Sequence, residues 1–554
     1  MKRIVIAAIL SVIAAGSLAQ EASESIEVRV VNVDVVVRDR AGKPVTGLTK
    51  ADFEIFENGQ KREITNLYEV RAPEAAISTA AKTTPAASAP SETPTEIRPR
   101  NIVMFVDNYS IEPFRRDKVL QSLDKFVEQL GPQDKVMLVL ETQKTTVITP
   151  FTSDRKAIRA GVETIRKSAG TFNRTASIDH LKQTVNEYIS MAKEGGRLEW
   201  KDAYTRATSD VGSHVEEEIF SGRNTLAALG QITAALAGLE GKNVIIFVGA
   251  HLPERPGQEL YQWLYNAFTT YMTNLTFSNE SISGKTGSMQ HYSIEEAAKQ
   301  ASANGVALYI IDAADSRDAG SAETTSSVDQ AEQFTTFTNT AMAYQTLARI
   351  SGGLAITNTS NFDSAFSTLV NDLNSYYSLG FKPSDTTAPG LRRIVVKMKN
   401  PEYRFRARET YIPSSKAPQD EMSARVIANL YTTDPHNVWE VSVKPGTPEK
   451  QGSEFRVPIE VTMAPTITLA PEGDNLVGNF AVLIVVGNGE NTSKVIRNVH
   501  AVKVPVDAED DFREKKITYK ATIAMTPGDN VISVAVVDQA NKSAGFARAK
   551  VAIP

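Results

Sequence analysis

NIVMFVDNYSIEP, residues 101–113, is the stretch that decides the fold of this chain. Its apolar run ends at Asp107 and passes directly into a polar turn, and the next apolar residues, between 119 and 130, follow at helical spacing. A continuous apolar run of this length predicts a strand that is buried on both faces of a parallel sheet. Ligands bind such sheets at the carboxyl ends of the strands, so Asp107 is the first candidate for a functional residue.

Short apolar strands alternate with helical segments from residue 101 to about 383. The later predicted strands are KVMLVLE, TTVITPF, NVIIFVG, GVALYIID and GLAITNT, and the predicted helices include residues 154–167 and NTLAALGQITAALAGL. This alternation predicts an α/β fold with a doubly wound, mostly parallel sheet that helices cover on both faces. Two polar stretches, 168–220 and 312–338, interrupt the pattern, and we interpret them as insertions, the first of them partly helical.

The residues that precede this domain favour β structure and then a linker. Residues 26–70 carry valines in near alternation and include DFEIFENGQKREI, which predicts a hairpin around Asn58 and Gly59 within a small β module. Residues 71–100 consist largely of Ala, Pro, Ser and Thr, with almost no apolar anchor. That composition predicts a disordered linker between two folded units.

The residues that follow the alternating pattern return to β structure. RRIVVKMKN and RFRARETYI predict a hairpin at the edge of the α/β domain, which on this basis spans residues 101–412. Residues 420–554 contain strands separated by turn signals such as PGDN and NKSAG. We expect a C-terminal β-sandwich there.

Composition excludes several classes of function. The chain has 554 residues, 42% of them hydrophobic, so it can bury several ordinary cores. Its net charge of −5 and pI of about 5.9 lack the basic footprint of a nucleic-acid-binding protein. It contains no cysteine, which excludes disulfides, thiol nucleophiles and thiolate metal sites.

Residues 1–19 have the pattern of a secretory signal peptide. Two basic residues precede an apolar run, and small residues at Ser17 and Ala19 form a cleavage site. The run is shorter than the roughly 20 residues that a membrane span needs. We therefore expect an exported protein without a membrane span, located in a bacterial periplasm, secreted, or at the cell surface.

Residues 101–383 resemble a von Willebrand factor type A domain, and the order of elements is similar to the variant called the VWFA-related acidobacterial domain. The resemblance covers most of residues 26–412. It rests on VNVDVVVRDRAGKPVTGLTKADFEIFENGQ, IVMFVDN, ANGVALYIID, LARISGGLAITNT, NSYYSLGFKP and RRIVVKMKNPEYRFRARETY. It implies a metal-ion-dependent adhesion site at the carboxyl end of the sheet. Type A relatives build that site from an Asp, hydroxyls two and four positions later, a Thr on a second loop, and an Asp after another strand.

The first loop of this implied site departs from the pattern. Asp107 matches the family's first ligand, but the two hydroxyl positions hold Tyr109 and Ile111, and Ser110 is a hydroxyl out of register. Mg²⁺ requires several oxygen ligands in near-ideal geometry. The loss of both hydroxyls therefore predicts a weakened site.

The other two loops also depart from the ligand pattern of the family. Thr225, in the predicted loop SGRNTLAAL, stands near the expected position, and Gly249 replaces the second acid. We therefore predict that no metal or other cofactor is needed and that Asp107 is structural, capping the next helix or accepting turn amides. The alternative is a bound Mg²⁺, with Asp107, Ser110 and Thr225 as its ligands.

Other candidates for chemistry are weaker. SGKT at residues 283–286 lacks the glycine of a phosphate loop, because Asn279 occupies that position. The six histidines are scattered, and His251, just after NVIIFVG, is interpreted as a solvated loop residue that could also act as an acid or base. No G-x-S-x-G elbow occurs. The acidic runs HVEEEIF and DAEDDF are interpreted as solvated surfaces, with a weak Ca²⁺ site in the second as an alternative.

These observations favour an exported, non-enzymatic protein-interaction module of the adhesion type. The partner is expected to be a protein of the envelope or the cell surface, bound where the strand-end loops converge. The residues predicted for this surface are Asp107, Asn108, Tyr109, Ser110, Thr225 and His251. The alternatives are a Mg²⁺-dependent adhesion or sensing protein and an envelope hydrolase that uses His251.

Overall fold

The computed structural model describes most of the chain from residue 30 onward. The described residues are 30–71, 99–142, 144–168, 174–194, 198–272, 292–314, 327–384, 390–413, 418–433, 437–452, 454–488 and 492–554. The predicted signal peptide, nearly all of the predicted linker and the SGKT motif lie outside these ranges. Predictions about those segments therefore stay predictions.

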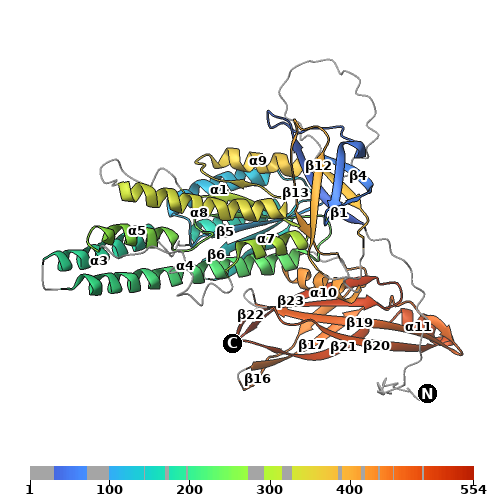
Figure 1. Ribbon diagram of the computed structural model, residues 1–554. Coiled ribbons are helices and arrows are strands. Elements are labelled where there is room, and N and C mark those ends of the chain that lie inside the picture. Colours follow the sequence, from blue (N-terminus) through green and yellow to red (C-terminus); the bar gives the residue numbers. More distant parts are fainter. Residues whose placement is uncertain are drawn as a thin grey trace.

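A six-stranded sheet forms the centre of the molecule (Figure 1). Its strands, in spatial order, are β10 (Ala355–Ile356), β9 (Val306–Asp312), β8 (Lys242–Gly249), β5 (Arg100–Asp107), β6 (Lys135–Glu141) and β7 (Thr145–Thr152). All neighbours pair in parallel except β6 and β7, which are antiparallel. The predicted α/β fold with a mostly parallel sheet is therefore confirmed.

Helices cover both faces of this sheet, which explains the unbroken apolar run of β5. Ile102, Met104 and Val106 contact the core on one face, whereas Val103 and Phe105 contact the core on the other. The first face is covered by α1 (Pro113–Glu128), α2 (Arg155–Lys167) and α9 (Phe362–Asn374). The second is covered by α4 (Trp200–Leu236), α5 (Gln258–Thr269), α7 (Ile294–Ala303) and α8 (Ser327–Ser351), and α3 (Arg174–Lys193) packs on α4. Within the described part of the chain, no helix combines the length and hydropathy of a membrane span.

The predicted insertion at residues 168–220 forms two long helices. α3 packs against the N-terminal part of the 37-residue helix α4, and the pair extends beyond the end of the sheet (Figure 1). The apolar residues of both helices join the core on the same face of the sheet as α5 and α8. The insertion therefore adds to the central domain rather than forming a separate unit.

The N-terminal strands form two sheets together with strands from after the α/β domain (Figure 1). The first sheet has the order β13 (Arg404–Ala407), β1 (Val31–Arg38), β11 (Ser375–Phe381) and β4 (Ile64–Arg71). The second has the order β14 (Thr410–Tyr411), β12 (Arg392–Met398), β2 (Phe53–Glu57) and β3 (Gln60–Arg62). The predicted β2–β3 hairpin is confirmed, and both of its turn residues, Asn58 and Gly59, have positive φ.

The predicted hairpin of RRIVVKMKN with RFRARETYI is confirmed only for the last residues of the second segment, where β14 pairs antiparallel with β12. β12 pairs with β2 and β14, whereas β13 pairs with β1 in the other sheet. The physical reason is the core between the two sheets, where Ile394 of β12 packs with Val35 and Leu379 of the facing sheet. The chain thus crosses from one sheet to the other after β12, and residues 375–411 complete the predicted N-terminal module.

Buried ion pairs link the strands of the second sheet to one another and join the first sheet to the α/β domain. Glu57 is 1% exposed and contacts Arg62, Arg392 and the Tyr411 hydroxyl. Burial opposes ionisation of Glu57, but hydrogen bonds from Tyr411 and Arg392 lower its pKa to about 2. Asp372 of α9 pairs in the same way with arginines from β1 and β13.

The C-terminal residues form the predicted β-sandwich. One sheet contains β15 (Ser442–Pro445), β16 (Glu449–Gln451), β17 (Glu454–Met463) and β21 (Ile517–Met525). The other contains β18 (Ala470–Glu472), β19 (Asn475–Gly487), β20 (Ile496–Pro505), β22 (Gly528–Asp538) and β23 (Ala544–Ile553). Their inner faces share one core around Trp439, and α10 (Pro418–Ala428) covers the outer face of the second sheet. The acidic run at 507–512 lies in η4 (Val506–Ala508) and α11 (Glu509–Arg513).

Candidate functional site

Asp107 ends β5 in a hydrogen-bonded turn. Its side chain is buried, and Oδ1 accepts hydrogen bonds from the backbone N–H groups of Tyr109 (3.2 Å) and Ser110 (3.2 Å). The Ser110 hydroxyl in turn accepts a hydrogen bond from the backbone N–H of Ala250 (2.9 Å), just after β8. Asp107 therefore occupies the turn-amide geometry predicted for a structural residue, and Ser110 joins the loops after β5 and β8.

Buried carboxyl groups lie at the carboxyl ends of three strands. Burial raises the pKa of Asp107 to about 6, although hydrogen bonds from Ser110 and Tyr109 oppose this change. Burial also raises the pKa of Glu141, at the end of β6, to about 7 and that of Asp312, at the end of β9, to about 7. The cause in each case is desolvation, which disfavours the charged form.

The residues at the implied Mg²⁺ position do not fit a magnesium site. Ile111 is a buried core residue and supplies no oxygen. At Gly249, a Cβ atom would lie 2.6 Å from the Phe247 ring and 3.3 Å from the Tyr344 hydroxyl, so an acidic side chain has no room there. Because Asp107 already accepts two turn amides, the donor set lacks the oxygen ligands that Mg²⁺ requires.

Three of the predicted surface residues, Asp107, Asn108 and Thr225, are buried. The prediction of a loop at SGRNTLAAL is wrong, because these residues lie inside α4, where the Thr225 hydroxyl donates to the Ser221 carbonyl (3.3 Å). The helix continues because its apolar residues on both sides of Thr225 pack on the sheet. Asn108 is fully buried, and its Oδ1 accepts a hydrogen bond from Arg116 (3.0 Å).

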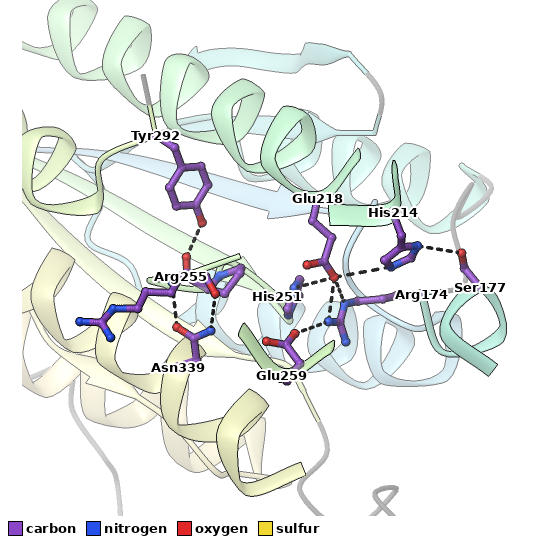
Figure 2. Close-up of polar contacts among 10 residues, drawn as sticks. Arg174, Ser177, His214, Glu218, His251, Arg255, Glu259, Tyr292 and Asn339 are labelled. Carbon is purple, nitrogen blue, oxygen red and sulfur yellow. Dashed lines mark hydrogen bonds and ion pairs between the residues drawn. The ribbon is translucent and has the colours of Figure 1, made fainter. Parts of the chain in front are cut away.

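A buried cluster of charged groups lies between α3, α4 and α5 (Figure 2). The Arg174 guanidinium lies 2.8 Å from Glu218 Oε1 and 2.7 Å from Glu259 Oε1. His251 Nε2 lies 3.4 Å from the same Glu218 oxygen, and His214 Nε2 lies 3.7 Å from it. The Nδ1 atom of His214 lies 3.4 Å from the Ser177 hydroxyl.

This cluster corrects two interpretations made from the sequence. The run HVEEEIF is only partly a solvated surface, since the side chains of His214 and Glu218 are 7% and 6% exposed. His251 is likewise buried against Glu218, with 12% of its side chain exposed. The signal that could have found the pair is the four-residue spacing of His214 and Glu218, which places both on one face of a helix.

Electrostatics within the cluster favour the ionised form of Glu218. Burial by itself would raise its pKa, but the Arg174 guanidinium and His251 hold the pKa well below its ordinary range. Arg174 also pairs with Glu259, which is fully buried. Three ionisable side chains from separate helices thus share one buried position.

A small cavity connects this cluster to the turn after β5. Its volume is about 30 Å³, and its lining includes Tyr109, Ser110, Glu218 and His251. The exposed residue Glu217 also lines it. The structure therefore brings Tyr109, Ser110 and His251 together as the sequence predicted, whereas Asn108 and Thr225 lie elsewhere in the interior.

Comparison with known proteins finds structural matches only. No protein-family model and no curated protein matches the sequence. BatB from Bacteroides thetaiotaomicron matches with 12% identity over 50% of this chain and 97% of that one, at a TM-score of 0.22. The mussel-byssus protein PTMP1, with a zinc-occupied MIDAS motif, matches with 11% identity over 50% of this chain and 48% of that one, at a TM-score of 0.22. The PilB minor pilin from Streptococcus sanguinis matches with 9% identity over 62% of this chain and 78% of that one, at a TM-score of 0.25. At these scores the matches carry no argument about function.

The class of fold follows from the sheet itself. A mostly parallel six-stranded sheet has one antiparallel edge strand, helices on both faces, and a polar turn after its central strand β5. This arrangement defines a type A-like α/β domain, which the chain combines with antiparallel sheets from its two ends.

Proposed function

We propose that this protein is an exported, non-enzymatic interaction protein of the VWFA-related kind. Its type A-like domain receives a protein partner at the carboxyl end of the central sheet, and the sheets at the two ends of the chain position that domain. The partner belongs to the bacterial envelope or the cell surface. Binding at this end does not require Mg²⁺.

The observation that carries this proposal is the set of hydrogen bonds in the turn after β5. Asp107 and Ser110 make hydrogen bonds within the protein, so they build a rigid turn rather than the open ligand set of a magnesium site. That turn holds Tyr109, a partly exposed aromatic residue, in the lining of the small cavity. Rigid aromatic side chains beside polar groups are typical of binding hot spots.

The test is capture of an envelope partner by the full-length protein. Two variants, Tyr109→Ala and Glu217→Ala, remove side chains from the lining of the cavity without entering the buried cluster. Loss of an aromatic hot spot costs about 2 kcal/mol or more, so we expect Tyr109→Ala to weaken binding of the captured protein by roughly 30-fold. Tyr271→Ala, which removes an exposed tyrosine just after α5, is the matched control.

Chelation distinguishes this proposal from the Mg²⁺-dependent alternative. Capture of the same partner should be equal in EDTA and in Mg²⁺, because the strand-end residues do not form a magnesium site. Equal capture by wild type and Tyr109→Ala would place the partner surface elsewhere, and capture that disappears in EDTA and returns with Mg²⁺ would establish the alternative. Fractionation of the native cells tests the export of the protein.

A further inference from the structure

Three of the clustered side chains have the arrangement of metal ligands. One ligand atom from each of Glu218, His251 and Glu259 lies within 4.8 Å of the others. The three residues come from α4, the segment after β8, and α5, so they join three elements of one core. His214 lies one turn before Glu218 on the same helix.

Four lone-pair-bearing atoms in this cluster have unmet hydrogen-bonding capacity. Glu218 Oε2 and Glu259 Oε2 are buried and have no hydrogen-bond partner among the described residues. His214 Nε2 and His251 Nε2 are also buried, and they lie 3.7 Å and 3.4 Å from Glu218 Oε1 without hydrogen-bond geometry. Leaving one such buried group unsatisfied costs on the order of 1–3 kcal/mol. Four of them in one place indicate that the cluster is completed by a species that accepts lone pairs.

We propose that this cluster binds one divalent transition-metal ion of the zinc type, with Glu218, His251 and Glu259 as ligands and His214 as a fourth. Imidazole nitrogens together with carboxylate oxygens suit Zn²⁺, whereas Mg²⁺ prefers an all-oxygen set that keeps several waters. The site is distinct from the position of Asp107 that the type A resemblance implies. Partner capture plays no part in it, so it stands independently of the proposed function.

Arg174 and Ser177 have the roles of outer partners for these ligands. Arg174 holds the Oε1 atoms of both glutamates, which leaves both Oε2 atoms for the ion. Ser177 lies at His214 Nδ1, and a partner at that nitrogen orients the imidazole so that Nε2 faces the cluster (Figure 2).

Titration of the full-length protein with Zn²⁺, measured by isothermal titration calorimetry, tests this site. We expect one Zn²⁺ to bind per chain and His251→Ala or Glu259→Gln to weaken binding by more than about tenfold, since even outer partners change metal affinity by about 10–100-fold. The matched controls are His180→Ala and Glu187→Gln, which remove exposed side chains of α3 and should leave the affinity unchanged. Affinities for wild type and His251→Ala that agree within error, or no saturable uptake by wild type, would overturn the proposal.

Cobalt substitution provides a readout that does not depend on the folding of any variant. Wild type loaded with Co²⁺ should show visible absorption bands of low-coordinate cobalt with nitrogen and oxygen ligands, and one equivalent of Zn²⁺ should remove them. His251→Gln, which keeps a polar side chain of similar size, should abolish the bands while its far-UV circular dichroism stays unchanged. A wild-type spectrum equal to that of hydrated Co²⁺ contradicts the proposed site.

Discussion

Asp312→Asn should change the pH dependence of the stability of the α/β domain. Asp312 is 2% exposed at the end of β9, where its Oδ1 accepts a hydrogen bond from the Ala314 backbone N–H (2.9 Å). An asparagine keeps that acceptor and nearly the same shape, but it does not ionise. The substitution therefore isolates the cost of a buried charge at this position.

The magnitude follows from the pKa. Burial raises the pKa of Asp312 from 3.8 to about 7, a change of about three pH units that corresponds to roughly 4 kcal/mol. The folded state binds the extra proton, so this contribution is fully present below pH 4 and is lost as the pH rises to 7. Between pH 5 and pH 8, wild type should lose roughly 3 kcal/mol more unfolding free energy than Asp312→Asn.

Urea unfolding followed by tryptophan fluorescence measures this difference. Both proteins carry Trp439→Phe, so that the only remaining tryptophans, Trp200 and Trp263, report on the α/β domain. Asp117→Asn, an exposed substitution on α1, is the control and should follow wild type at every pH. Parallel pH profiles for wild type and Asp312→Asn would refute the inference that the buried carboxyl is protonated in the folded state.

Two further predictions concern packing. Glu57→Gln should destabilise the paired β-sheets by about 3–5 kcal/mol at pH 7 in urea unfolding, because it leaves Arg392 buried without a charged partner, whereas the more exposed Glu54→Gln should have little effect. Gly353→Ala should lower the melting temperature, since its Cβ would lie 1.9 Å from the Leu308 carbonyl oxygen. Gly212→Ala in α4 should raise the melting temperature, because only the Tyr261 hydroxyl lies near the added Cβ. Alanine also favours the helix over glycine by about 1 kcal/mol. Equal melting temperatures for these two glycine variants would contradict the packing argument.

Much of the site depended on contacts that no local pattern contains. The sequence placed Tyr109, Ser110 and His251 at one end of the sheet, because strand order brings loops after parallel strands together. It did not reveal Arg174 and Glu259, which lie 85 residues apart and meet only when α3 packs near α5. The run containing His214 and Glu218 looked like solvated surface because charge is visible in a sequence and burial is not.

The sequence by itself determined the elements and their class. The apolar run of β5, the helical spacing of the residues after it, and the Asn58-Gly59 turn each follow from periodicity or φ preference within a few residues. The tertiary structure alone decided the partners of residues 375–411 and the fusion of the helix predicted from Asn224 with the preceding residues into one α4. Both depend on which apolar faces meet, and a strand offers the same backbone hydrogen bonds to any neighbour. Ile394 and Val35 share a core although they are far apart in the chain, and this burial, rather than local sequence, selected the pairing.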